Sequence, residues 1–364
     1  MQITMEKFNQ WYTDHMARIP FIQKIFFVDH LKTMIHAGLS LVESLAVLSK
    51  EIENKKLQQI IQAIKTGVEK GDQLSDVLAK YPKAFPPIYV KMISAGEVSG
   101  KLEESLVQIT IQMKKSYELS SSIRSAMIYP AVILTAMGGI GIMMITVVLP
   151  KLITIFEEFD SELPLPTRVL IAVTNFMSKP LNLISVFVVI IGLIMTFIWA
   201  LKKYPNFKYF IHKMNLHLPI AGAVIKKINL AQFSLTLSSL LNSAIPIADA
   251  LEITAHTCGN VLYRDTLLVA SEKIKTGFPL SDILVANPNL FPPMVTEMIM
   301  VGEKSGAVDQ LLIELSNFYS TEVDKTMKNF TTIIEPVIII MLGLAVAGMA
   351  VAIIMPMYSL VQNF

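Results

Sequence analysis

Three long stretches of this chain contain no charged side chain, and they limit its possible folds more than any other feature. They cover residues 125–150, 180–201 and 336–364. Each reaches the roughly 20 apolar residues that a helix needs to cross the hydrocarbon core of a bilayer. Lipid offers no partner to backbone N–H and C=O groups, so such a segment has to satisfy them internally as a helix. The sequence therefore predicts three transmembrane helices.

The rest of the chain has the composition of soluble domains. Charged residues make up 16% of the sequence, and all of them lie outside the three stretches. A hydrophobic content of 53% excludes a disordered chain. The net charge of +2 is too small for nucleic-acid binding that depends on the field of the whole protein. The single cysteine, Cys258, excludes a disulfide framework and a cysteine zinc site, and it is typical of a reducing compartment.

An internal repeat with a constant offset divides the chain. The matching residues are Leu74–Leu78 with Leu280–Leu284, then Phe85, Pro86 and Pro87 with Phe291, Pro292 and Pro293, then Gly96–Gly100 with Gly302–Gly306, and finally Pro130 and Pro150 with Pro336 and Pro356. Every pair is 206 residues apart. We infer a duplication in which each copy, from about Phe27 to Pro150 and from about Phe233 to Pro356, is a soluble segment followed by one span.

A fourth charge-free window, Ile228–Ala248, competes with the three spans. It contains eight polar side chains, and the repeat aligns it with the region around residue 32. That region carries Lys24, Asp29 and Lys32, which a membrane span would not tolerate. We therefore predict a soluble amphipathic helix in the fourth window.

The distribution of basic residues predicts the topology, because lysine and arginine are retained on the cytoplasmic side. Two copies in the same orientation need one extra crossing between them, and residues 180–201 supply it. The second span is followed by Lys202, Lys203, Lys208, Lys213, Lys226 and Lys227 without an acidic residue. The loop 151–179 instead contains Glu157, Glu158, Asp160 and Glu162. We expect the N-terminus and both soluble copies in the cytoplasm, and the loop and the C-terminus outside. No apolar signal-peptide core occurs in residues 1–24, so the first span is expected to direct insertion.

The periodicity of the soluble segments predicts an all-α fold with two tandem cytoplasmic bundles of about six helices each. Ser40 and Glu43 form the pattern of a capping box, and apolar residues follow at helical spacing. Further helices are predicted over residues 74–79 and from Pro86 to about Gly96. Long helices are expected from about Lys101 into the first span and from about Asp309 into the third.

The expected organisation has nine segments. They are an N-terminal segment (1–24), the first cytoplasmic bundle (25–124), transmembrane helix 1 (125–150), an external loop (151–179), transmembrane helix 2 (180–201), a basic cytoplasmic linker (202–230), the second cytoplasmic bundle (231–330), transmembrane helix 3 (333–356) and an external tail (357–364).

Two repeated motifs in the soluble copies are candidates for structural or binding roles. Gly96, Glu97 and Gly100, repeated as Gly302, Glu303 and Gly306, predict a tight helix–turn–helix. The glutamates either belong to a plain turn or contact a partner or a second copy. Phe85, Pro86 and Pro87, repeated as Phe291, Pro292 and Pro293, predict a helix start with the phenylalanine packed inward, and a binding role is the alternative.

The starts of the first and third spans carry the remaining candidates. Tyr129 and Pro130 precede the first span, and Glu335 and Pro336 occupy the same positions before the third. An acid at membrane depth is a functional candidate, whereas one at the interface remains hydrated, and both interpretations are open for Glu335.

No set of residues for catalysis or for metal or cofactor binding is visible in the sequence. Gly96–Lys101 does not match a phosphate-binding loop, because three residues separate its glycines and Leu102 follows Lys101. The six histidines show no zinc-protease spacing. We therefore predict no catalytic residue, no cofactor and no metal.

Taken together, these elements resemble the type II secretion F family. The resemblance covers about residues 20–364 and depends on Phe-Pro-Pro, on Gly-Glu-x-Ser-Gly, on the span start Ile128-Tyr129-Pro130 and on the span end Leu149-Pro150. The basic residue that the family often carries eight positions before the proline is Ser122 in the first copy, whereas the second copy has Lys328. Members are the inner-membrane platform proteins of type IV pilus and type II secretion machines, such as PilC and GspF, with ComGB in competence systems.

The resemblance implies a platform protein of the bacterial inner membrane that is not an enzyme. The implied partners are a hexameric cytoplasmic secretion ATPase, pilin or pseudopilin subunits, other inner-membrane assembly proteins, membrane lipid and further copies of the chain in a dimer or trimer, with no nucleic acid bound directly. The alternative is a small polytopic transporter, which predicts more spans and a polar pathway within the membrane. A second alternative, an enzyme of the membrane surface, predicts a catalytic set of residues.

Overall fold

The computed structural model describes residues 19–151, 165–219 and 221–362. In these ranges the chain is helical apart from short turns and contains no strand, which confirms the all-α prediction. Two compact units are present. One combines the described residues up to Ser121 with His212–Val323, and the other combines Ser122–Ile211 with the chain from Asp324 onward. The soluble helices of both copies therefore belong to the first unit.

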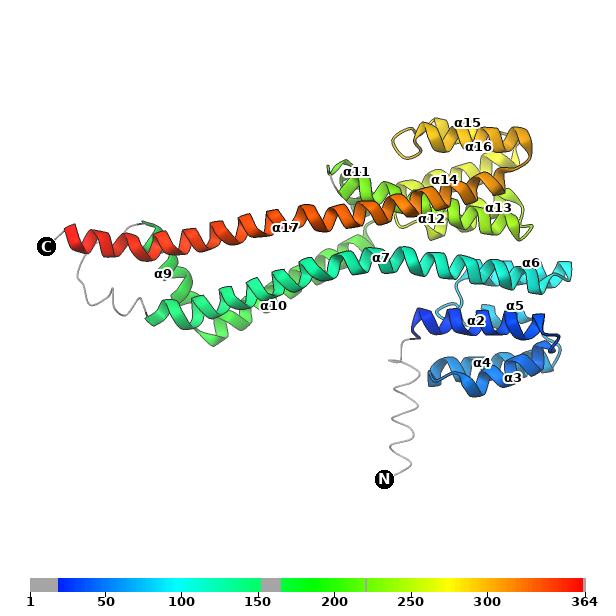
Figure 1. Ribbon diagram of the computed structural model, residues 1–364, viewed down its shortest axis with the longest axis horizontal. Coiled ribbons are helices and arrows are strands. Elements are labelled where there is room, and N and C mark those ends of the chain that lie inside the picture. Colours follow the sequence, from blue (N-terminus) through cyan, green and yellow to red (C-terminus); the bar gives the residue numbers. More distant parts are fainter. Residues whose placement is uncertain (1–18, 152–164, 220, 363–364) are drawn as a thin grey trace, which may run out of the picture. The chain divides into compact units, whose positions relative to one another are not determined.

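The first copy contributes five complete helices and the start of a sixth to this unit (Figure 1, blue to cyan). They are α2 (Phe21–His36), α3 (Leu41–Glu51), α4 (Lys55–Glu69), α5 (Leu74–Ala79), α6 (Pro87–Ser99) and α7 (Leu102–Met143).

The second copy repeats this order. Its helices are α12 (Ala221–Asn242), α13 (Ile247–Thr257), α14 (Val261–Lys275), α15 (Leu280–Val285), α16 (Pro293–Ser305) and α17 (Val308–Gln362). Both ends of α13 to α16, and the first residue of α17, lie 206 residues after those of α3 to α7. The two copies are therefore one fold repeated without insertion or deletion.

Side-chain caps fix the beginnings of two helices in the first copy. The Ser40 hydroxyl accepts a hydrogen bond from the Glu43 amide at 3.3 Å, and the Glu43 carboxylate accepts one from the Ser40 amide at 3.0 Å. Asn54 accepts from the Leu57 amide at 3.0 Å. Each cap satisfies N–H groups that the first turn of a helix leaves without a partner. The capping box predicted from the sequence is confirmed.

The same positions form the core of both copies, with compensating changes of size. Fully buried side chains at equivalent positions include Leu45, Leu48, Leu57, Ile61 and Ile64 in the first copy and Leu251, Thr254, Tyr263, Leu267 and Ala270 in the second. The larger Tyr263 stands at the position of Leu57, and the smaller Ala270 at that of Ile64. Cores tolerate such exchanges when the total volume is kept.

The turns between helices also repeat, with one exception. Gly71 and Gly100 have positive φ angles of 95° and 69°, and their equivalents Gly277 and Gly306 have 89° and 72°. At the turn after α2, Gly38 has φ 85°. Its equivalent after α12 is Ala244, which adopts φ 57° although a Cβ disfavours this conformation.

Three described helices are long and apolar enough to cross a membrane. They are α7 with its continuation to Lys151, α10 (Pro180–Lys203) and α17. The end of the first span passes through a short π-helical segment, η1 (Met144–Val148). These are the three spans expected from the sequence, and the fourth apolar window lies instead in α12 and the start of α13, within the first unit.

Three sequence expectations need correction. Part of the expected loop 151–179 is helix α9 (Leu165–Met177), which packs against α10 and η1, while the acidic residues of that loop lie outside the described residues. The expected linker 202–230 contains helix α11 (Pro205–His217). Helix α12 is not amphipathic, because Leu230, Ala231 and every residue from Phe233 to Leu240 are buried. Polar side chains in it are covered by protein rather than by water.

The strained turn at Ala244 leads to a prediction. Replacing Ala244 with Gly removes the contact between the Cβ and the backbone, so we expect the free energy of unfolding to rise by about 1 kcal/mol. The matched change, Gly38→Ala, should lower it by a similar amount. Thermal unfolding of the full-length protein in detergent measures both. A lower unfolding midpoint for Ala244→Gly would contradict the strain.

Candidate functional site

The Phe-Pro-Pro motif is part of the core of each copy. Phe85 is 3% exposed, and its ring lies 5.6 Å from that of Phe27 on α2. Pro86 precedes the first residue of α6, and Pro87 is that residue. A proline suits the first turn of a helix because the amide it lacks would have no partner there.

The second copy repeats this arrangement. The Phe291 ring lies 5.4 Å from Phe233 on α12 and 5.3 Å from Tyr263 on α14. Pro292 precedes α16, and Pro293 is its first residue. The inward packing predicted for both phenylalanines agrees with these contacts, and the rings are not available at the surface.

Glu97 and Glu303 cap a helix that is distant in the sequence. The Leu74 and Ser75 amides donate to the two Glu97 carboxylate oxygens at 2.5 and 2.9 Å. In the second copy, the Leu280 and Ser281 amides donate to Glu303 at 2.5 and 3.2 Å. Each carboxylate therefore satisfies the first amides of the short helix α5 or α15 and attaches it to α6 or α16. A negative charge at a helix N-terminus is also favourable to the helix dipole.

The glycines around these glutamates have different roles. The predicted helix end near Gly96 is wrong, because α6 continues to Ser99 and the left-handed turn is at Gly100. Gly96 lies inside the helix, where a Cβ would overlap the Ser105 side chain on α7. In the second copy, a Cβ on Gly302 would lie 2.9 Å from the Val308 backbone. These two glycines allow consecutive helices to approach closely.

The candidates at the starts of the spans belong to the second compact unit. Tyr129 is 40% exposed and Pro130 is buried. Glu335 and Pro336 are both exposed. Both prolines lie within continuous helices, α7 and α17.

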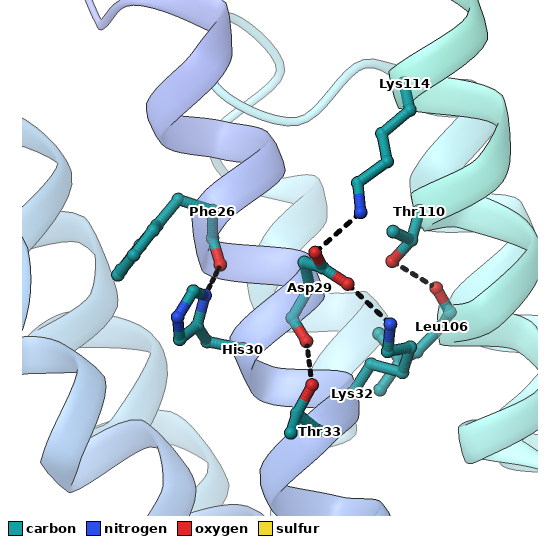
Figure 2. A network of polar contacts seen from close by, with 8 residues as sticks. All are labelled: Phe26, Asp29, His30, Lys32, Thr33, Leu106, Thr110 and Lys114. Carbon is teal, nitrogen blue, oxygen red and sulfur yellow. Dashed lines mark hydrogen bonds and ion pairs between the residues drawn. The ribbon is translucent and has the colours of Figure 1, made fainter.

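A polar network between α2 and α7 was not predicted from the sequence (Figure 2). Lys32 and Lys114 donate to the two carboxylate oxygens of Asp29 at 2.5 and 2.7 Å. Asp29 and Lys114 are far apart in the sequence, so spacing alone gave no signal for this pair. The second copy lacks the network, because the equivalents of the three residues are Leu235, Ser238 and Ser320.

A second polar network joins the two copies within the first unit. Gln112 on α7 donates to the Thr236 hydroxyl on α12 at 3.3 Å and accepts from the Ser239 hydroxyl at 2.8 Å. Lys115 donates to the Asn317 side chain on α17 at 2.7 Å. The Gln112 contacts give Thr236 and Ser239 polar partners inside the unit, while Asn229, Ser238, Asn242 and Ser243 donate to carbonyls of α12 itself. Among the described residues, no group of three metal-ligating side chains lies together.

The caps on α5 and α15 can be tested separately. Replacing Glu97 with Ala leaves the Leu74 and Ser75 amides without an acceptor, so we expect a loss of about 1–2 kcal/mol in the stability of α5. Hydrogen exchange measured on the full-length protein should show faster exchange at α5 only. Glu303→Ala should act in the same way on α15. Glu104→Ala, at an exposed position on α7, is the control. Unchanged exchange at α5 in the Glu97 variant would exclude the cap.

The network around Asp29 predicts a response to acid that is limited to the first copy. Burial opposes ionisation of Asp29, but hydrogen bonds from Lys114 and Lys32 outweigh it and lower the pKa of the carboxyl group. A pKa that is lower in the folded than in the unfolded protein stabilises the fold at pH values above the unfolded pKa, which is about 3.9 for aspartate. This stabilisation is lost as the pH falls through the lower pKa of the folded protein. We therefore expect amide hydrogen exchange in α2 to become faster below about pH 4. The substitution Asp29→Asn should remove this dependence on pH. Helix α12 has Leu235 at the position of Asp29. An equal increase of exchange in α12 at low pH would contradict the role of Asp29.

Comparison with known proteins places most of the chain in one family. The sequence profile described as type II secretion system (T2SS), protein F, matches residues 27–150 and 233–356, which are the two copies. The type IV pilus assembly protein PilC of Thermus thermophilus is 35% identical over 355 residues, or 95% of this chain and 86% of that protein. PilC of Myxococcus xanthus is 34% identical over 336 residues, covering 92% and 80%.

A relative from a secretion machine is nearly as similar. The type II secretion system protein F of Pseudomonas aeruginosa is 30% identical over 332 residues, covering 91% of this chain and 81% of that protein. With both copies matched and relatives that span the chain, the protein belongs to the type II secretion system protein F family.

Proposed function

We propose that this protein is the inner-membrane platform of a type IV pilus or type II secretion assembly machine. In this role it couples a cytoplasmic secretion ATPase to the insertion and extraction of pilin or pseudopilin subunits. The observation that carries the proposal is that the relatives, which align over nine-tenths of the chain, are named as type IV pilus assembly and type II secretion system proteins.

The three apolar helices and the family make this a multi-pass membrane protein. We propose that its membrane is the bacterial inner membrane, with both helical bundles in the cytoplasm and the segment between the first two spans outside. The lysines that follow α10 and the acidic residues of loop 151–179 support this orientation. It would place both bundles within reach of a cytoplasmic motor.

Two helices continue from the soluble unit into the spans. α7 runs from Leu102 to Met143 and α17 from Val308 to Gln362 without interruption. A continuous helix transmits displacement along its axis because every backbone hydrogen bond resists extension. We propose that α7 and α17 carry movement from the bundles to the part of the membrane where pilins enter and leave.

The protein is proposed to act without chemistry of its own. The repeated glutamates, glycines and Phe-Pro-Pro motifs all make structural contacts within their own copy, and we assign them to the rigidity of the bundles. A small transporter, the alternative function, is disfavoured because relatives at this identity are named for assembly and secretion. The proposed homo-oligomer, a dimer or trimer, would multiply the surface offered to a hexameric ATPase.

Uncoupling the two long helices tests the proposal. Two glycines inserted after Arg124 or after Lys328 interrupt α7 or α17 between bundle and span. We expect each insertion to abolish pilus assembly, or pseudopilus-dependent secretion, in cells that lack their own platform gene. The thermal unfolding midpoint should change little, since both bundles remain complete.

The same insertion after Lys179, in the turn between α9 and α10, is the matched control and should be tolerated. Normal assembly with the Arg124 and Lys328 insertions would exclude transmission through these helices.

A further inference from the structure

A basic pocket lies in the second copy, where the end of helix α11 meets the bundle. Its volume is about 300 Å³, which is at the lower end of the range for small-molecule sites. The polar side chains that line it are Lys213, His217, Lys226, Asn287 and Asn289. The other described residues of its lining are apolar, and no carboxylate is among them. The pocket therefore offers hydrogen-bond donors and positive charge without an acid to balance them.

Contacts among α11, α12 and α14 fix two walls of this pocket. The Asn260 side chain donates to the His212 carbonyl at 3.3 Å, and the Val261 amide donates to His212 Nδ1 at 3.1 Å. These bonds attach α11 to the start of α14. Gly222, at the start of α12, packs so closely on α11 that a Cβ would lie 2.4 Å from the Leu216 carbonyl oxygen. The walls are thus in place before a ligand binds, which reduces the cost of binding.

The turn between α15 and α16 forms a further wall and carries the two asparagines. The Tyr263 hydroxyl on α14 donates to the Leu290 carbonyl of this turn at 2.7 Å and holds it in position. Each asparagine amide has two N–H donors. Asn287 uses one of its donors on the Ile283 carbonyl at 3.4 Å, and the Asn289 side chain is exposed. The turn therefore retains N–H groups that a ligand can use.

The two lysines of the pocket pair with no carboxylate among the described residues. The adjacent Lys227, by contrast, pairs with Glu322 at 2.9 Å. Two like charges that line one small pocket repel each other, and an anion between them replaces this repulsion with attraction. His217 Nδ1 donates to the Lys213 carbonyl at 2.8 Å, so the protonated ring has Nε2 as a further donor.

The first copy has different residues at these positions. The equivalents of Lys226, Asn287 and Asn289 are Pro20, Tyr81 and Lys83. In that copy the Lys24 ammonium group donates to the Lys83 carbonyl at 2.9 Å. The equivalent of Lys24 in the second copy is the buried Leu230. The donors of the pocket are therefore not required by the fold that both copies share, which favours a role in binding.

We propose that the pocket formed by α11, α12, α14 and the turn between α15 and α16 binds a phosphate group. The negative charge and the several acceptor oxygens of phosphate match two ammonium groups and the neighbouring amide donors. Charge-assisted hydrogen bonds of this kind are stronger than those between neutral groups, and lysine is a common phosphate ligand. Two sources supply the group. One is a dissolved phosphate compound, and the other is an anionic phospholipid, since only Tyr204 separates α11 from the apolar helix α10.

Hydrogen exchange of the full-length protein tests the site and separates the two sources. In one arm, inorganic phosphate is added to the protein in a neutral detergent, with sodium chloride of equal ionic strength as the reference. In the other arm, the protein is placed in phosphatidylcholine nanodiscs with or without phosphatidylglycerol. We expect slower exchange over residues 213–217 and 286–290. Protection by phosphate identifies a dissolved ligand, and protection by phosphatidylglycerol alone identifies a lipid headgroup. Unchanged exchange in both arms would overturn the proposal.

Matched variants show whether the lysines of the pocket make the contact. Lys226→Gln, or Lys213→Gln at an exposed position, should raise the concentration for half-maximal protection about tenfold, because each removes a hydrogen bond from a charged donor. Lys226→Arg keeps the charge and should retain the protection. Lys227→Gln removes the same charge one residue away and should have no effect.

Thermal unfolding shows that each variant is folded. Equal weakening by Lys226→Gln and Lys227→Gln would mean general attraction to positive charge and would also overturn the proposal. The inference depends on this pocket and not on the platform role, so its failure leaves the proposed function untouched.

Discussion

The lipid bilayer is the constraint on which the rest of this structure depends. Its hydrocarbon core admits only backbone whose hydrogen bonds are satisfied within the segment, so the three apolar stretches form helices. It also disfavours charged side chains, and all charged residues of this chain lie outside these stretches. A duplicated module with one span per copy can present both soluble copies on the same side only if an odd number of further crossings separates its two spans. Helix α10 supplies that extra crossing. The proposed location of both helical bundles in the cytoplasm, on the side of the ATPase, follows from this arrangement.

Sequence patterns predicted most of the fold because its determinants are local or repeated. The capping box at Ser40, the short helix over residues 74–79 and the helix start at Phe85 each depend on neighbours within a few residues. The segments around α9 and α11 were expected to be a loop and a linker, because their charges and prolines concealed short helices. Gly96 was assigned to a turn because a glycine in a helix interior is unusual, and the reason for it, the nearby Ser105, lies on another helix.

The contacts between distant segments could not be predicted from spacing. Glu97 accepts hydrogen bonds from amides more than 20 residues away, and a sequence pattern identifies the glutamate but not its partners. The carboxylates of Glu97 and Glu303 accept the same two backbone hydrogen bonds, which makes them part of the fold that both copies share. The Asp29 network lies in the first copy only, whereas the Gln112 contacts join the first copy to the second. After duplication, the two copies thus retained one core while their surfaces diverged toward different neighbours.

The central claim is that both bundles lie on the inner side of the membrane. Single cysteines at Val98 and Val301, two exposed positions on α6 and α16, report the location of each bundle, and one at Lys179 reports the segment between the first two spans. An impermeant maleimide added to intact cells should label position 179 and neither of the others, whereas inverted membrane vesicles should give the reverse. Labelling of position 98 or 301 from outside intact cells would contradict the account.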